Sequence, residues 1–156
     1  MRNSPVCGAA LFTIAAAALF AAGCGSSNVT DEVGLTQVTF PNGVRINAET
    51  MRRELELMRG LMFRESLPSD RGMLFIHPAE SAFHYWMYQT KIPLDIIWMD
   101  HDRRIVEMSL DTAPCRSTSA KDCPEYGGHF KSKYVLEVGA GVARKNGLKT
   151  GETLDF

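Results

Sequence analysis

The sequence lacks several signals that would point directly to a chemistry. It contains no phosphate-binding glycine loop, no Gly-x-Gly-x-x-Gly fingerprint and no Gly-x-Ser-x-Gly turn, which disfavours nucleotide-dependent and serine-hydrolase activities. The formal net charge is only −1, so we expect no nucleic-acid partner. No second long apolar run follows the one near the start of the chain, and we therefore do not expect the remainder to span a membrane.

Charged side chains are almost absent from the start of the chain, where Arg2 is the only one before Asp31. An apolar run from Gly8 to Ala22 follows Arg2, and it is shorter than the roughly 20 residues that a bilayer-spanning helix needs. Small residues then lead up to Cys24. A basic start, a short apolar run and a small-residue cleavage site are typical of a secretory signal peptide, which we predict over residues 1–23.

Small residues that end at a cysteine also resemble the lipobox of bacterial lipoproteins, although Ala21 stands where that motif usually has leucine. We therefore predict that Cys24 is acylated and that residues 24–34 form a flexible tether. The protein would then be exported and anchored to a membrane of the bacterial cell envelope. The alternative is ordinary cleavage and a soluble periplasmic protein, in which Cys24 would be an unpaired thiol in an oxidising compartment.

Cysteine is scarce in the chain that remains after cleavage. Cys7 lies in the predicted signal peptide and Cys24 is the acylation candidate, which leaves Cys115 and Cys123 in one polar segment. A disulfide between them would close a short loop and contribute about 2 to 3 kcal/mol, so we expect it to order that loop rather than to support the whole fold. The rival interpretation is a metal or redox dithiol, but the spacing is not Cys-x-x-Cys and no histidine lies between the cysteines.

One amphipathic helix is predicted early in the mature chain. Asn47 is a candidate N-cap, residues 49–59 form the helix, and Gly60 ends it. Methionine fills irregular gaps in a core well, so burial would explain the methionines of this helix without a further role. Four apolar side chains fall at helical spacing on the face that we expect to be buried, namely Met51, Leu55, Met58 and Met62.

The rest of the mature chain is predicted to be mostly strands, in a single domain over residues 35–156. A second, short helix is expected over residues 140–146. One clear helix, one short helix and many strands indicate the α+β class. The expected strands cover residues 35–40, 44–46, 72–76, 83–87, 94–100, 105–110, 134–138 and 152–156.

A series of ordered motifs runs through the mature chain from Val38 to Phe156. They are Gly60-Leu61-Met62-Phe63-Arg64, Gly72-Met73-Leu74-Phe75, Trp86-Met87 with Thr90, Ile92-Pro93-Leu94-Asp95-Ile96-Ile97, and Tyr134-Val135-Leu136-Glu137 with Ala140-Gly141 and Gly151-Glu152. Together they resemble the domain of unknown function 192 family. The resemblance implies a small, mostly antiparallel, β-barrel-like domain with helices packed at its side, often exported or membrane-attached in bacteria and archaea. It implies no catalytic residues.

Some residues of these motifs are candidates for a ligand site. A guanidinium suits a carboxylate or phosphate, an indole offers a flat stacking face, and a carboxylate accepts hydrogen bonds from hydroxyl groups. We therefore expect a pocket for a small polar or sugar-like ligand. The candidates are Arg64, Trp86, Thr90, Asp95 and Glu137.

A structural role is the alternative for the charged members of this set. Asp95 and Glu137 lie among apolar strand residues, where a buried charge must be paired. Arg64 would then bridge one of them as a structural ion pair. In a further alternative, the two acids form the carboxylate pair of a hydrolase-like enzyme, which would hold them about 5 to 9 Å apart. Such enzymes are usually larger than this domain, so we lean toward a protein that is not an enzyme.

Copper binding is the remaining alternative. Met62, Met73 and Met87 near His77 and His84 offer thioether and imidazole groups, which suit copper ions. No Met-x-Met, His-x-His or His-x-x-x-His spacing supports it, so we predict no metal site and no cofactor. The sequence as a whole predicts a cell-envelope lipoprotein that binds a small polar ligand or serves as an accessory module. Its expected partner is the membrane, through the lipid anchor.

Overall fold

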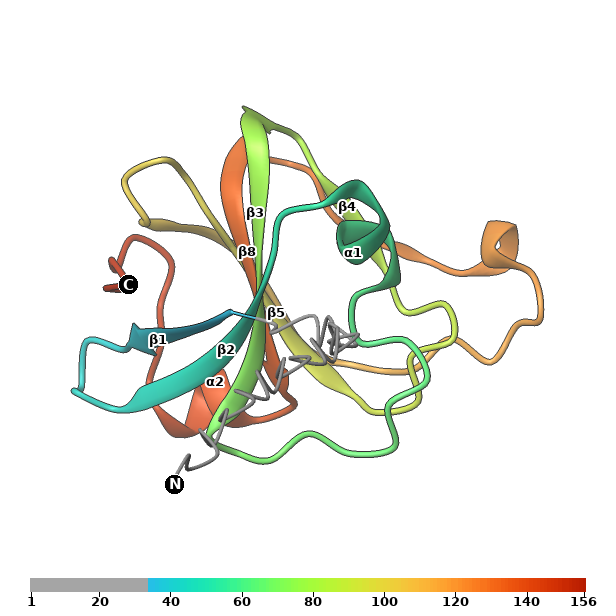
Figure 1. The fold of residues 1–156 in the computed structure, drawn as a ribbon, viewed down its shortest axis with the longest axis horizontal. Helices are drawn as coiled ribbons and strands as arrows, with labels where there is room; N and C mark the ends of the chain where they lie inside the picture. The colour runs from blue at the N-terminus through green and yellow to red at the C-terminus, as the bar shows by residue number, and fades with distance from the viewer. Residues whose placement is uncertain (1–33) are drawn as a thin grey trace, which may run out of the picture. The chain divides into compact units, whose positions relative to one another are not determined.

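The structure is a computed structural model that describes residues 34–156. The predicted signal peptide, Cys24 and nearly all of the predicted tether lie outside the described residues. Within residues 34–156, no helix has the length and apolar character needed to cross a membrane. Figure 1 shows this part of the chain as a strand-rich domain with two short α-helices and a 3-10 helix over Ala120–Asp122.

A six-stranded sheet forms the centre of the domain. Its neighbouring strands are antiparallel except β2 and β3, which run parallel, so the sheet is mixed. The predicted α+β class is confirmed, and the sheet is open rather than a closed barrel. In spatial order the strands are β1 Leu35–Thr39, β2 Arg45–Met51, β3 Arg71–Ser81, β8 Ser132–Gly139, β5 Leu94–Met99 and β6 Ile105–Thr112.

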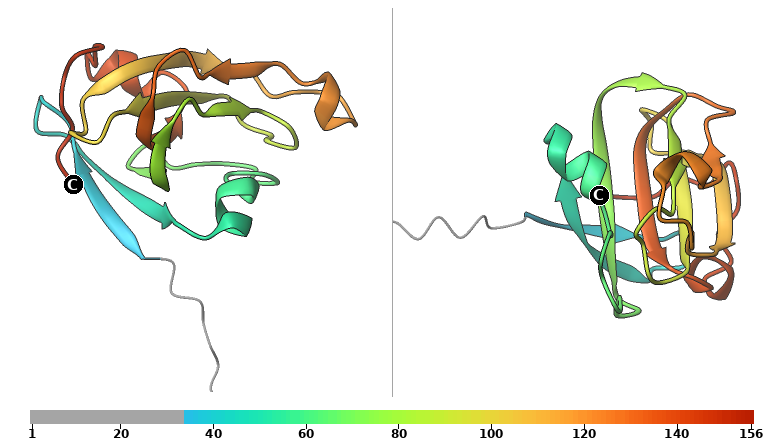
Figure 2. Two further views of the ribbon diagram at one scale, coloured as in Figure 1. Left: turned by 90° about the horizontal axis from the view of Figure 1, so that it is seen from above. Right: turned by 90° about the vertical axis from the view of Figure 1, so that its right-hand side faces the viewer.

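The C-terminal segment links the two edge strands of this sheet. Thr39, at the end of β1, pairs with Asp155, and Arg104, directly before β6, pairs with Thr153. The strand predicted over residues 152–156 is therefore present only as isolated bridges. These bridges hold together one end of a strongly curled sheet, as Figure 2 shows.

Each face of the sheet carries its own core, because successive side chains of a strand point to opposite faces. Leu74 and Ile97 belong to the first core. Phe75, Trp98 and Val135, from the same strands and from β8, belong to the second core. β5 is buried along its whole length, since it contributes side chains to both cores.

The helix predicted over residues 49–59 is wrong in its first half. The chain stays extended to Met51 because β2 pairs with β1 on one side and with β3 on the other, and Asn47 lies within this strand. Only Glu54–Arg59 form a helix, α1. Glu56 closes its first turn, since the carboxylate accepts two backbone N–H hydrogen bonds at 3.0 and 3.1 Å.

The apolar face of α1 was predicted to be buried, but it is exposed. Leu55 is 80% exposed and Met58 is 60% exposed, whereas Met51 is buried in the second core from its position on β2. Within this six-residue helix, Leu57 packs against the second core. Two large apolar side chains of α1 consequently point away from the interior.

A second, two-stranded sheet lies outside the main one. It pairs β4 (His84–Trp86), which was predicted, with β7 (Glu125–Gly127), which the sequence did not reveal because it lies in a polar segment. Between β6 and β7, Cys115 and Cys123 form the predicted disulfide. The predicted short helix is confirmed as α2 (Val142–Lys145).

Candidate functional site

A cleft of about 400 Å³ opens beside α1, and we name it the α1 cleft. Its walls come from β2, from α1, from the turn of residues 60–64 that follows α1, and from β3. Its volume lies in the range of small-molecule sites. The lining residues are Glu49, Met51, Glu56, Arg59, Gly60, Met62, Phe63, Arg64 and Met73.

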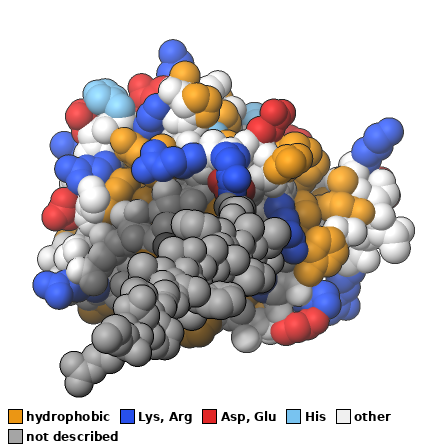
Figure 3. Space-filling view, in the orientation of Figure 1, with side chains coloured by type: hydrophobic (Ala, Val, Ile, Leu, Met, Phe, Trp, Pro, Cys, Tyr) orange, Lys and Arg blue, Asp and Glu red, His pale blue; other side chains and the backbone are white. Residues whose placement is uncertain are grey.

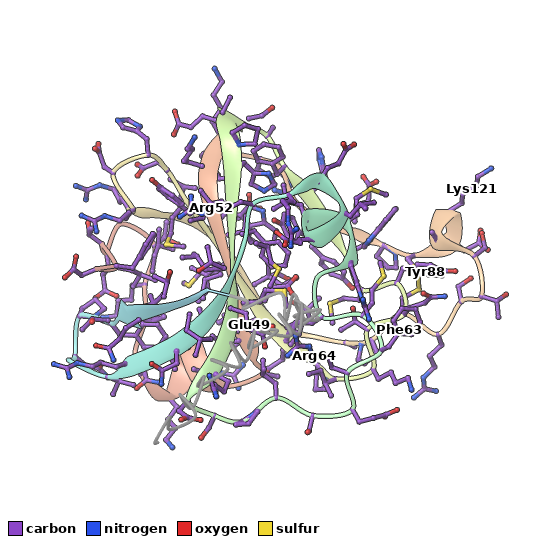
Figure 4. All side chains as sticks on the ribbon, in the orientation of Figure 1. Glu49, Arg52, Phe63, Arg64, Tyr88 and Lys121 are labelled. Carbon is purple, nitrogen blue, oxygen red and sulfur yellow. A yellow bond between two sulfur atoms is a disulfide. The ribbon has the colours of Figure 1, made fainter. Side chains whose placement is uncertain are left out.

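Arg64 reaches across this cleft to Glu49 on β2. Its Nη1 and Nη2 atoms each donate a hydrogen bond to one carboxylate oxygen at 2.5 Å, and this pairing raises the pKa of Arg64. Figure 4 labels the two residues. The predicted ion pair of Arg64 with Asp95 or Glu137 is therefore wrong, because the turn that carries Arg64 lies beside β2, from which Glu49 enters the cleft.

The turn after α1 has an unusual backbone. Gly60 has a φ of 45°, and a Cβ atom there would lie 3.1 Å from the Phe75 ring, so this approach requires glycine. Phe63 (φ 66°) and Gln89 (φ 54°) also have left-handed conformations, and the N–H of Phe63 donates to the carbonyl oxygen of Gln89 at 2.8 Å. Two strained positions thus meet at the rim of the cleft, as often happens at functional sites.

A smaller cavity of about 30 Å³ shares Arg59, Gly60 and Met62 with the α1 cleft. We name it the Glu137 pocket. Its volume is enough for about one water molecule. The other lining residues are Leu57, Met58, Leu61, Phe75, Tyr85, Trp86, Thr90 and Glu137.

Glu137 is the buried acid of this pocket. Its side chain projects from β8 into the second core, on the same face as Val135, and the residue is only 5% exposed. Within residues 34–156, no group forms a hydrogen bond or an ion pair with its carboxyl group. Burial raises the pKa of Glu137 from 4.5 to about 8. The carboxyl group is therefore mostly protonated at neutral pH and can donate a hydrogen bond.

The neighbours of Glu137 are also uncharged. Burial and the nearby Glu137 raise the pKa of Tyr85 well above its ordinary value. The Tyr85 hydroxyl and Nε2 of His77 share a hydrogen bond of 3.0 Å, and burial together with Lys133 lowers the pKa of His77 to about 4. Thr90 adds a hydroxyl-bearing side chain that is 7% exposed. Apart from Arg59, the pocket therefore offers neutral hydrogen-bonding groups in an apolar surrounding.

Arg59 is a cation shared by the two cavities. It is exposed in the last turn of α1, and none of residues 34–156 forms an ion pair or a side-chain hydrogen bond with it. The sequence analysis missed it. An arginine in the last turn of a helix is usually a solvated partner of the helix dipole, and its position directly before Gly60 was the only available signal.

Asp95 lies on the opposite face of the sheet from Glu137. It pairs in register with Val138, which belongs to the first core. Asp95 is fully buried, and its two carboxylate oxygens accept the backbone N–H groups of Asp111 (2.8 Å) and Ala143 (2.9 Å). It lines neither the α1 cleft nor the Glu137 pocket. Asp95 and Glu137 therefore do not face one cleft as a carboxylate pair.

Four of the five predicted ligand residues lie at the two cavities. Trp86, Thr90 and Glu137 line the Glu137 pocket, and Arg64 lines the α1 cleft. Asp95 instead ties the end of β6 and the start of α2 to the sheet. The candidate site consequently combines the unpaired guanidinium of Arg59, the neutral buried acid Glu137, the hydroxyl group of Thr90 and apolar walls.

The sulfur and imidazole groups of the copper hypothesis line different cavities. Met62 and Met73 line the α1 cleft, whereas His77 and His84 line a separate cavity of about 250 Å³. Across the described part of the chain, no group of three or more His, Cys, Asp or Glu residues is placed to hold a metal ion.

Comparison with known proteins identifies relatives of the whole domain. A protein of unknown function from Novosphingobium aromaticivorans, known from a crystal structure, shares 30% identity over 78% of this chain and 85% of its own, with a TM-score of 0.67. A Sinorhizobium meliloti protein, described as a candidate transcription regulator, shares 25% identity over 76% of this chain and 89% of its own, also with a TM-score of 0.67. No curated protein matches the chain.

The family comparison covers every residue of the candidate site. Residues 37–156 match the DUF192 family, which is described as an uncharacterized ACR. This match confirms the resemblance that the sequence motifs suggested. The chain belongs to the domain of unknown function 192 family.

Proposed function

We propose that this protein is an exported lipoprotein, anchored to a membrane through Cys24, whose domain binds a small polar ligand at the α1 cleft and the Glu137 pocket. It serves as a binding or accessory module rather than as an enzyme. The signal-like start, the small residues before Cys24 and the polar stretch after it support the export and the anchor.

The buried carboxyl group of Glu137 is the observation that carries the ligand proposal. An acid in an apolar core costs free energy unless it has partners, and Glu137 has none within residues 34–156. It borders a cavity that shares three lining residues with an open cleft. A ligand group that enters this cavity would supply the missing hydrogen bonds.

The other groups at the site indicate the chemistry of the ligand. Arg59 is suited to a carboxylate, since a guanidinium binds this group with two parallel hydrogen bonds. Thr90 and the protonated Glu137 suit hydroxyl groups, and Met62 and Phe63 provide apolar contact. A sugar acid combines a carboxylate, hydroxyl groups and an apolar ring face, and it fits a cleft of about 400 Å³.

Several of the motifs that resemble the family converge on this site. Gly60 and Met62 line both cavities, Arg64 lines the cleft, and Thr90 and Glu137 line the pocket. These residues come from three motifs that lie far apart in the sequence. Their meeting at two adjoining cavities supports a common role in binding.

Calorimetric titration with glucuronate and with glucose tests the proposal, because the two sugars differ mainly in the carboxylate. We expect the protein to bind glucuronate more tightly. The Arg59→Gln variant should lose that preference, by roughly tenfold or more in affinity. Arg45→Gln is the matched control, because Arg45 is exposed and does not line the cleft. Absence of glucuronate binding, or equal binding by the Arg59→Gln variant, would contradict the proposal.

A second candidate function is the binding of Cu(I) by thioethers. Met51, Met62 and Met73 line the same cleft, and thioether sulfur suits this ion. Anaerobic titration of Cu(I) against a chromophoric chelator tests this candidate, with the Met62→Leu variant as the comparison. Stoichiometric Cu(I) uptake that the variant loses would support it, and uptake well below one ion per chain would exclude it.

A further inference from the structure

α1 and β4 present an apolar surface that no other described residue covers. Leu55 (80% exposed) and Met58 (60% exposed) lie three residues apart, on one side of α1. Trp86 on β4 is 40% exposed and borders two cavities together with Met58. We name these three residues the α1 patch. Figure 3 shows apolar side chains gathered over α1 on this face of the domain.

The surroundings of the α1 patch combine aromatic and basic groups. Phe63 is 51% exposed, and the rings of Trp86 and Tyr88 lie 6.3 Å apart. Arg59 stands in the last turn of α1. Tryptophan, tyrosine and arginine beside exposed apolar side chains are typical of surfaces that lie in the headgroup region of a membrane.

The described chain begins on the same side of the domain as α1. Both views in Figure 2 place the start of β1 and α1 toward one side. Gly34 directly precedes β1, and Cys24 stands ten residues earlier in the sequence. A segment of ten residues spans at most about 35 Å. An acyl chain on Cys24 would therefore hold this side of the domain close to the membrane.

We propose that the α1 patch docks on the surface of the phospholipid bilayer that holds the Cys24 anchor. Leu55, Met58 and Trp86 enter the boundary between headgroups and acyl chains. This inference rests on the proposed anchoring at Cys24. It also places the α1 cleft at the membrane surface, because Arg59 lines that cleft.

A membrane explains the patch better than a second copy of the chain does. A stable dimer buries roughly 800 Å² on each partner, and the patch consists of only three large side chains. A lipid surface needs no matching shape. It needs only a few apolar side chains close to an existing anchor, since the anchor already supplies most of the binding free energy.

Fluorescence quenching by brominated lipids tests the docking directly. The protein has two tryptophans, and Trp98 is fully buried. We would reconstitute the full mature lipoprotein into vesicles of phosphatidylcholine and phosphatidylglycerol with bromine on the acyl chains near the carbonyl end. We expect bromine to quench the emission of Trp86. The Trp86→Phe variant, which retains only Trp98, should lose that quenching.

Introducing negative charge into the patch provides the matched variants. Leu55→Glu with Met58→Glu should abolish the quenching, whereas Leu110→Glu, at an exposed apolar residue of β6, should leave it unchanged. Equal Trp86 emission with and without bromine on anchored protein would overturn the docking and leave the anchor intact. A Trp86 signal that depends on protein density but not on bromine would identify a second copy instead. Intact mass showing an unmodified Cys24 would overturn both the anchor and the docking.

Discussion

Two buried carboxyl groups lie on neighbouring strands of the sheet, on opposite faces, and their surroundings differ. Asp95 on β5 faces the first core and accepts two backbone N–H hydrogen bonds. Glu137 on β8 faces the second core and lacks any partner within residues 34–156. Ile96, next to Asp95, is the residue that pairs in register with Glu137. The structural acid and the candidate binding acid are thus only one register position apart in the sheet, and this offset places them on opposite faces.

The difference shows that burial alone does not indicate the role of an acid. Asp95 stabilises the fold because each of its carboxyl oxygens accepts a backbone N–H hydrogen bond, which joins β6 and α2 to β5. The unpaired Glu137 destabilises the fold when ionised, and it borders a cavity. A buried acid that lowers stability without a structural partner is a candidate for function.

The largest expected effect is the removal of the satisfied acid. Asp95→Ala leaves the N–H groups of Asp111 and Ala143 without their acceptor, and we expect it to lower the free energy of unfolding by about 2 to 5 kcal/mol. Urea denaturation at neutral pH measures this loss. Asp95→Asn retains one acceptor oxygen and should cost less. A loss below about 1 kcal/mol for Asp95→Ala would remove the structural half of the comparison.

Removal of the unpaired acid, Glu137, should raise stability at high pH, whereas removal of Asp95 lowers it. The folded protein keeps the Glu137 proton up to pH about 8, whereas the unfolded chain releases it near 4.5. Stability therefore falls as pH rises from 4.5 to 8 and is constant above that range. Above pH 8, Glu137→Gln should be more stable than the wild type by roughly 2 to 4 kcal/mol.

Denaturant curves at several pH values measure this effect of Glu137→Gln. The variant should lack the fall in stability between pH 4.5 and 8. The Asp95→Asn variant is the control, since it should retain that fall. A destabilised Glu137→Gln variant above pH 8 would show that the carboxylate has stabilising partners after all.

His77 sharpens the comparison on the acidic side. Burial and Lys133 lower the pKa of His77 to about 4, whereas the unfolded chain binds this proton near pH 6.5. Stability therefore falls as pH drops from 6.5 to 4. The free energy of unfolding that is lost between pH 6.5 and pH 4 should be smaller by roughly 1 to 3 kcal/mol in the His77→Gln variant. Thermal unfolding at these two pH values would measure the difference. An unchanged pH profile would mean that His77 is protonated in the fold.

The smallest expected effect concerns Arg64 and Glu49. Their ion pair is bidentate but partly exposed, with 38% of the Arg64 side chain and 22% of the Glu49 side chain accessible, so we expect Arg64→Ala to cost about 1 kcal/mol. A double-mutant cycle with Glu49→Gln, measured by urea denaturation, isolates the coupling between them. A coupling near zero would indicate that the pair shapes the cleft without stabilising the fold.

The positions of most strands along the chain could be predicted from apolar patterns. The strands around Leu94–Met99 and Tyr134–Val138 were found because apolar residues with high strand propensity are concentrated there. The helix predicted over residues 49–59 is wrong in its first half because β2 has two neighbouring strands. The hydrogen bonds to these strands outweigh a helical spacing of apolar residues. β7 was not predicted because its pairing with β4 depends on the tertiary fold.

Several candidate residues could be named from the sequence, but their partners and the faces on which they lie could not. Glu137 and Asp95 have similar apolar neighbours in the sequence, so only the register of β5 with β8 assigns them to opposite faces. Arg64 lines the cleft, but its partner Glu49 lay in the segment that we predicted to be helical. Contacts between distant segments determine the faces of the two acids and the partner of Arg64, and these contacts could not be predicted from a single sequence.

The state of the Glu137 carboxyl group is the most direct test of this account. Carbon NMR of the protein labelled at the glutamate side-chain carboxyl carbon, with Glu137→Gln to assign the signal, follows its protonation as a function of pH. The account predicts a midpoint near 8, shifted on addition of a ligand that occupies the pocket. A midpoint at or below the ordinary value of 4.5 would show that Glu137 is already paired, and it would contradict the central claim.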